Sequence, residues 1–223
     1  AYLKIIENSD IKKFFFFFNL SILFAILISL SQNMITVFIN YELLTVSTIA
    51  LVAFNKSSAS NHSLKIYLFI LFFASLIIFF PIVIYLDINN IDYSNISTKL
   101  TITETICLII LMMFAIAKSA AIIIHIWLIK AMVAPHPVSA LLHAVAVVKS
   151  GIISFIKFIS FTIGFEYAAD LFTQYPVAIA AVPVITIIFA GIKALMKLNL
   201  KEILAFSTIS QLNIMIIIIF SGD

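Results

Sequence analysis

The sequence predicts an all-α protein, a polytopic bundle of about seven transmembrane helices. Of its 223 residues, 64% are hydrophobic and only 10% are charged, and the mean hydropathy is +1.23. An average soluble domain is about one quarter charged, and its core could not absorb this much apolar surface. A helix needs roughly 20 apolar residues to cross a bilayer of about 30 Å, so this length fits about seven spans joined by short loops.

Polar residues and prolines divide the apolar sequence into segments of membrane-spanning length. The predicted spans cover residues 14–31, 34–54, 66–86, 105–129, 137–162, 176–196 and 203–221. The first span has no small-residue cleavage site and is too long for the apolar part of a signal peptide, so we expect it to remain a helix. Because the chain starts with Ala1 rather than Met, we expect a fragment of a longer protein.

The lysines predict how the bundle is oriented. Loops on the side of the N-terminus hold nine of them, and the opposite side has Lys99 alone. Cytoplasmic loops carry the excess of basic residues in membrane proteins, so the N-terminus should face the cytoplasm or the mitochondrial matrix. We therefore expect an inner membrane, bacterial or mitochondrial. The nine are Lys4, Lys12, Lys13, Lys56, Lys65, Lys130, Lys193, Lys197 and Lys201.

Three lysines and one glutamate fall inside the predicted spans. Glu42, Lys118 and Lys149 lie near the middle of theirs, whereas Lys157 is nearer an end, where a long stem can reach the interface. A charge near the bilayer centre costs several kcal/mol and is kept where it is paired, hydrated or useful. These residues are therefore the candidates for function, although Glu42 and Lys118 could also form an ion pair that only fixes helix packing.

Lysine and glutamate together suit proton transfer inside a membrane. Burial favours the neutral form of a lysine amine, which can then give up and regain a proton, and a nearby carboxylate favours the charged form. Histidine adds a group that titrates near neutral pH. His125 follows Lys118 by seven residues and so points to nearly the same helix face, and His143 precedes Lys149. Each histidine could equally be a satisfied core residue.

Two prolines mark a junction between the fourth and fifth predicted spans. Pro135 and Pro137 flank His136. Proline lacks a backbone donor and disfavours helix in the residue before it, so this segment predicts a turn or a helix start. The lone Cys107 excludes a disulfide framework and a CxxC metal or redox motif, and we expect no metal and no cofactor in this chain.

Three blocks of sequence resemble the antiporter-like membrane subunits. They are YELL at 41–44, then AKSA, HIWL and AMVAPHPVSALLHA between 117 and 144, and LAFSTISQL at 204–212. That family includes the large subunits of Mrp-type sodium/proton antiporters and the proton-pumping membrane subunits of respiratory complex I. The blocks occur in the family's order and span most of the chain.

The resemblance implies a fold and a proton pathway. The family has a 14-helix inverted repeat of five-helix bundles, of which this chain would hold the first, at about 14–162, and the start of the second, at about 176–223. Glu42, Lys118, His143 and Lys149 match the family's ionisable positions and would form one proton half-channel. His125 and Lys193 are accessory candidates, and Lys193 could also simply extend to the interface. The family usually has proline where this chain has Ile123, which leaves open whether the helix after Lys118 is broken.

These observations predict a proton-translocating subunit of a cation/proton antiporter or respiratory complex, with Lys118 as the central proton carrier. Expected partners are other membrane subunits, protons, possible sodium ions and lipid, and not nucleic acid. The presence of both Lys149 and His143 slightly favours the Mrp-like branch over a subunit of NADH-quinone oxidoreductase or of a membrane hydrogenase. A non-conducting scaffold subunit is an alternative of another class. A solute channel would need a wide polar lining, which the few polar residues here do not supply.

Overall fold

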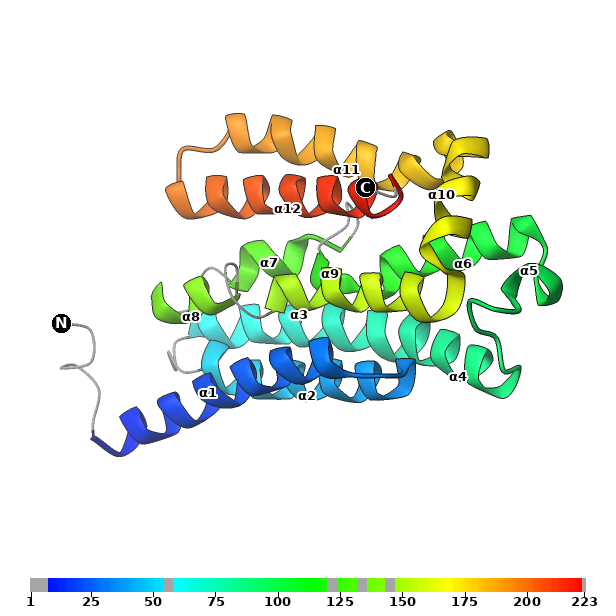
Figure 1. Cartoon of the computed structure of the whole chain (residues 1–223). Coiled ribbons are helices and arrows are strands. Elements are labelled where there is room, and N and C mark those ends of the chain that lie inside the picture. Colours follow the sequence, from blue (N-terminus) through cyan, green and yellow to red (C-terminus); the bar gives the residue numbers. More distant parts are fainter. Residues whose placement is uncertain (1–7, 54–57, 120–123, 132–135, 143–146, 222–223) are drawn as a thin grey trace.

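The computed structural model describes residues 8–53, 58–119, 124–131, 136–142 and 147–221, and every regular element within these ranges is a helix (Figure 1). The first two helices, α1 (Asn8–Leu30) and α2 (Met34–Val52), pack as a hairpin. The Asn33 side chain caps α2 by accepting a hydrogen bond from the Thr36 amide at 2.8 Å. Serine hydroxyls along α1 donate hydrogen bonds to carbonyls of the same helix, as the Ser21 hydroxyl does to the Phe18 carbonyl at 2.8 Å. No polar group of these side chains is therefore left for lipid to solvate.

The third predicted span is one long helix with a wider turn in its middle. It consists of α3 (Ser58–Ala74), a π-helical turn (Ser75–Phe79) and α4 (Phe80–Ile88). Pro81 lies in the first turn of α4, where its missing amide is tolerated because the wider turn absorbs the lost hydrogen bond. A short helix, α5 (Ile96–Lys99), follows in the connecting segment.

The fourth predicted span, 105–129, is not a single helix. A capping box between Thr101 and Glu104 starts α6 (Ile102–Ala115), and the helix stops at Ile116, whose φ of −78° and ψ of 59° are not helical. A 3₁₀ turn (Ala117–Ser119) follows, and α7 (Ile126–Ala131) continues beyond residues 120–123, which lie outside the described ranges. The helix is thus interrupted next to Lys118.

The fifth predicted span, 137–162, is described on both sides of residues 143–146, which lie outside the described ranges. It contains α8 (His136–Ala140) and then α9 (Val147–Phe158), which continues through a π-helical turn (Ile159–Ile163). At Gly164 the chain bends by 94° into α10 (Phe165–Gln174). The sequence did not predict α10, because its exposed acids interrupt the apolar pattern.

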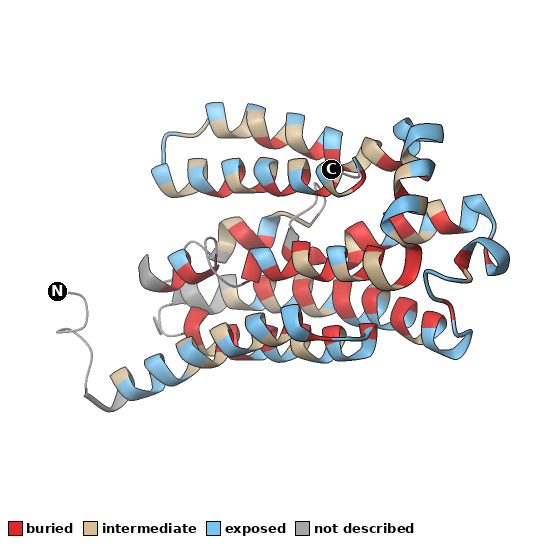
Figure 2. Cartoon of the chain, in the orientation of Figure 1, coloured by how far each residue is buried: buried red, intermediate tan, exposed pale blue. Residues whose placement is uncertain are grey.

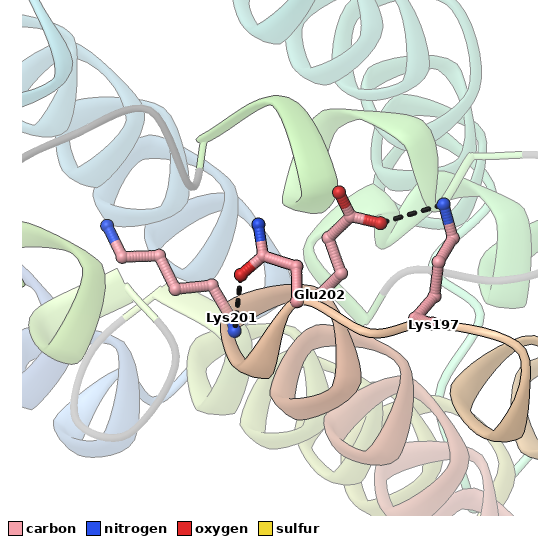
Figure 3. Close-up of polar contacts among 4 residues, drawn as sticks. Lys197, Lys201 and Glu202 are labelled. Carbon is pink, nitrogen blue, oxygen red and sulfur yellow. Dashed lines mark hydrogen bonds and ion pairs between the residues drawn. The ribbon is translucent and has the colours of Figure 1, made fainter.

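The last two helices, α11 (Pro176–Leu195) and α12 (Leu200–Ile219), form a second hairpin beside the rest (Figure 1). Its tight turn is held by the ion pair of Lys197 with Glu202 at 2.7 Å (Figure 3). The Asn199 side chain caps α12 by accepting from the Lys201 amide at 3.2 Å (Figure 3). Short polar contacts thus set where one span ends and the next begins.

Apolar side chains lie on both the inside and the outside of the bundle. Buried residues line the faces where helices meet, and the outer faces remain exposed (Figure 2). On α11 these exposed residues include Ile185, Ile188 and Ile192, each more than half exposed. A soluble protein would place polar residues there, so this surface is suited to lipid.

Five helices in the described ranges are long and apolar enough to cross a membrane without interruption, and a sixth span is possible if α9 and α10 count together. The predicted all-α membrane fold is confirmed. The two predicted spans that are missing from the five are 105–129, which is interrupted next to Lys118, and 137–162, of which residues 143–146 lie outside the described ranges. The start of α1 and the α11–α12 turn lie at one end of the molecule and α5, which carries Lys99, at the other (Figure 1). This separation matches the predicted division of the lysines.

Gly164 provides a test of the bend between α9 and α10. Its φ of 82° and ψ of 138° are readily adopted only by glycine. We predict that Gly164→Ala lowers stability by about 1–3 kcal/mol through backbone strain. A clash does not contribute, since the added Cβ would meet only the Tyr93 Cβ at 3.5 Å. The midpoint of thermal unfolding in detergent should fall.

Gly191→Ala is the matched control. Gly191 lies within α11, and a Cβ added there meets nothing within 4 Å. This substitution should stabilise the helix by up to about 1 kcal/mol. Equal unfolding midpoints for the two variants would contradict the role of the positive φ at Gly164.

Candidate functional site

Lys118 lies at the centre of the bundle. Its 3₁₀ turn contacts α3, α6, α9 and α12. Among the charged side chains that the structure describes, Lys118 alone is fully buried. The broken helix therefore brings an ionisable amine into the core and surrounds it with other helices.

Tyr41 of α2 contacts Lys118 in three ways. The Lys118 Nζ donates to the Tyr41 carbonyl at 2.5 Å and lies 3.2 Å from the centroid of the Tyr41 ring. The Lys118 amide donates to the Tyr41 hydroxyl at 3.2 Å. The carbonyl supplies a hydrogen-bond acceptor and the ring face attracts a cation, so the amine is held without a carboxylate.

Trp127 of α7 supports the same break from the other side. Its indole Nε1 donates to the Ala117 carbonyl at 2.8 Å, and the whole side chain is buried. An interrupted helix leaves backbone groups unpaired, and each unpaired group is costly in an apolar core. Tyr41 and Trp127 therefore supply from neighbouring helices the partners that the broken helix lacks.

Glu42 lies on α2 next to Tyr41, and its carboxylate is buried without a partner. Neither oxygen makes a hydrogen bond to any described residue. The Ser75 hydroxyl is close to it but donates to the Phe72 carbonyl at 3.2 Å. Buried polar groups in native structures are normally paired, so an unpaired carboxylate points to a function rather than to stability.

Glu42 and Lys118 influence each other electrostatically but do not form an ion pair. Within the described ranges the one ion pair joins Lys197 to Glu202. The alternative in which Glu42 and Lys118 only fix helix packing by pairing is therefore not what the structure has. The Glu42 carboxylate and the Lys118 amine thus lie close enough to interact electrostatically but not in direct contact, which we call the separated arrangement.

Lys149 occupies a different environment on α9. Its side chain is exposed and lines a pocket of about 370 Å³ between α9 and α12. The polar residues opposite it are Ser207, Thr208 and Gln211, which belong to the third sequence block. His143 lies outside the described residues, so its place relative to Lys149 stays a prediction.

The accessory candidates lie apart from the Tyr41 contacts. The His125 ring is 5.2 Å from that of Phe189 and 6.1 Å from that of Phe206. The Lys193 Nζ lies 5.8 Å from the centroid of the same Phe189 ring. Both therefore belong to an aromatic region between α7, α11 and α12.

The proline junction is described in part. Pro135 lies outside the described residues, and Pro137 is the second residue of α8, a position that tolerates proline because its amide needs no partner there.

No group of three metal-ligating side chains occurs in the part of the chain that the structure describes.

Lys157 has a structural position rather than a place near Lys118. Its Nζ donates to the Ser31 carbonyl, just beyond the end of α1, at 3.0 Å and lies 5.1 Å from the Phe161 ring centroid. A cation at a helix C-terminus satisfies orphan carbonyls and interacts favourably with the helix dipole.

Sequence reasoning missed the roles of Tyr41, Trp127 and Ser75. Tyr41 directly precedes Glu42, and Trp127 is the one tryptophan of the chain, so both had a signal in their position or rarity. Ser75 opens a π-helical turn, and no sequence pattern predicted that turn. Such turns are frequent at functional sites, and this one places its first side chain next to Glu42.

The all-α membrane fold agrees with comparisons to known proteins. A family model described as NADH:quinone oxidoreductase/Mrp antiporter, TM matches residues 31–223. The putative antiporter subunit mnhA2 from Staphylococcus aureus strains JH9 and JH1 is 33% identical over 225 residues. The match covers 97% of this chain and 27% of each relative, so the chain spans about a quarter of their length. This chain is an integral membrane protein and belongs to the NADH:quinone oxidoreductase/Mrp antiporter transmembrane family.

Proposed function

We propose that this chain is part of a proton-translocating subunit of a cation/proton antiporter, in which Lys118 is the central proton carrier. The observation that supports this most is the fully buried Lys118 amine beside an unpaired buried carboxylate at a helix break. A structural lysine would be expected in an ion pair. Here the amine rests on a carbonyl and a ring instead.

The chemistry of the separated pair suits proton transfer. An amine away from water can release its proton, and a carboxylate that approaches favours its recapture. Lys118 would load when its amine is near Glu42 and release when the two are apart. Glu42 thus adjusts the proton affinity of Lys118, and a small movement of the lysine side chain suffices.

Lys149 and His143 would pass the proton laterally. The pocket between α9 and α12 supports this direction, because it places the Lys149 side chain opposite three polar residues of the second hairpin. In this proposal residues 14–162 form the first five-helix bundle and 176–223 begin the second. Lys118 would then serve one half-channel and Lys149 the connection to the next.

Location and partners follow from the same proposal. The subunit would lie in a bacterial or mitochondrial inner membrane with its N-terminus on the cytoplasmic or matrix side. It would assemble with other membrane subunits and carry no cofactor of its own in this chain. The relatives' description as an antiporter subunit supports exchange of protons for a cation, with Na⁺ as the candidate. A proton-pumping subunit of an NADH-quinone oxidoreductase or hydrogenase is the alternative within the family.

Lys118→Ala in the complete gene product should reduce cation-driven proton movement by at least about 100-fold, the usual effect of removing a group that transfers protons. Lys118→Arg should fail as well, because arginine keeps the charge but does not release its proton. The measurement is the collapse of a pH gradient in inverted vesicles when Na⁺ is added, with amounts of inserted protein matched.

Lys157→Ala is the control for these lysine variants. It removes another amine from a predicted span, and it should lower stability by about 0.3–1 kcal/mol through lost helix capping. Exchange should remain. Unimpaired exchange in Lys118→Ala would sink the proposal, and the same protein then assembling normally would favour the scaffold alternative.

Glu42→Met should slow exchange by about tenfold or more, because the charge that adjusts the proton affinity of Lys118 is gone. The same variant should be more stable than the wild type by about 1–3 kcal/mol, because a buried carboxylate without a hydrogen-bond partner is removed. Exchange rate and thermal unfolding midpoint are measured on one preparation.

Glu166→Met on α10 serves as the matched acid. Glu166 is exposed, so the exchange rate and the free energy of unfolding should stay close to the wild type, the latter within about 0.5 kcal/mol. A loss of stability in Glu42→Met would show that the carboxylate contributes to packing instead.

A further inference from the structure

One residue, Tyr41, determines where the Lys118 amine rests. It is fully buried, and it offers the amine a carbonyl oxygen and a ring face at the same time. The Tyr41 ring is itself held by Phe79 of the π-helical turn, edge to face at 5.3 Å. The amine therefore rests on a surface whose orientation is fixed by packing.

The Tyr41 carbonyl accepts hydrogen bonds from two side chains. It also accepts a hydrogen bond from the Thr45 hydroxyl at 3.1 Å, so two side-chain donors converge on one oxygen. Carbonyl oxygens have two lone pairs and can hold several donors when these approach from different directions. The Lys118 amine is therefore held at this position without contact to a carboxylate.

We infer that Tyr41 is a positioning residue that holds the Lys118 amine on its carbonyl and ring face, apart from the adjacent Glu42 carboxylate. This inference rests on the proposed function and adds the residue that sets the separated arrangement. Tyr41 and Glu42 are consecutive on α2, so their side chains point about 100° apart around the helix axis. In this inference the lysine amine leaves Tyr41 when it moves to the Glu42 carboxylate.

The hydroxyl and the ring of the Tyr41 side chain contact different parts of Lys118. The hydroxyl accepts from the backbone amide and so belongs to the helix break. The ring face meets the amine and so belongs to the resting position. Tyr41→Phe removes only the first contact, whereas Tyr41→Leu removes both.

Loss of the ring should trap the amine on Glu42. In the complete protein, Tyr41→Leu should lower the maximal exchange rate by about tenfold or more, as misplacement of a reacting group does, with the half-saturating Na⁺ concentration little changed. Tyr41→Phe and Tyr41→Trp keep an aromatic face and should retain exchange within about threefold of wild type.

Phe155→Leu is the matched packing control. Phe155 of α9 is also fully buried, and its ring packs on Phe158 and Phe220. It should lose stability comparably and keep its exchange rate. Equal rate losses in Tyr41→Leu and Phe155→Leu, or failure of both aromatic replacements, would overturn the inference.

A double variant separates positioning from packing. With Glu42→Gln there is no carboxylate to trap the amine, so adding Tyr41→Leu should slow exchange no further, whereas two independent structural losses would multiply. Multiplying losses would overturn the inference.

Lys118→Ala in the same series tests the proposed function by itself: if it is inactive while Tyr41→Leu is normal, only the role of Tyr41 fails.

Discussion

Backbone groups inside a membrane must find partners within the protein, and two aromatic side chains supply such partners at the break beside Lys118. The hydroxyl of Tyr41 accepts from the Lys118 amide, and the indole of Trp127 donates to the Ala117 carbonyl. These residues come from α2 and α7. Two hydrogen bonds thus connect α2 and α7 to the turn that follows α6.

The same turn joins stability to chemistry. Because the 3₁₀ turn is packed by α3, α6, α9 and α12, the amine of Lys118 is removed from lipid and from water together. Tyr41 then compensates for the burial of the amine with a carbonyl and a ring, and the Glu42 carboxylate nearby is left uncompensated. The bundle is therefore locally less stable at this turn than an apolar core would be.

Local sequence signals predicted the spans and the buried charges but not how the spans are interrupted. Hydropathy located the uninterrupted helices, and the rarity of charge singled out Glu42 and Lys118. The break itself has no local signal, since Ile123 stands where a proline would have announced it, and its cause lies on other helices. The contact of Lys157 with Ser31 joins residues 126 positions apart, and α10 depends on a bend at Gly164. The role of His143 stays a prediction.

A helix interrupted by proline is interrupted from the moment it is made, whereas this one relies on side chains that arrive from elsewhere. The partners of Ala117 and Lys118 are therefore present only when α7 and α2 have packed against this turn. The Lys118 amine is enclosed only when α3, α6, α9 and α12 have packed around it, so its burial is a property of the assembled bundle.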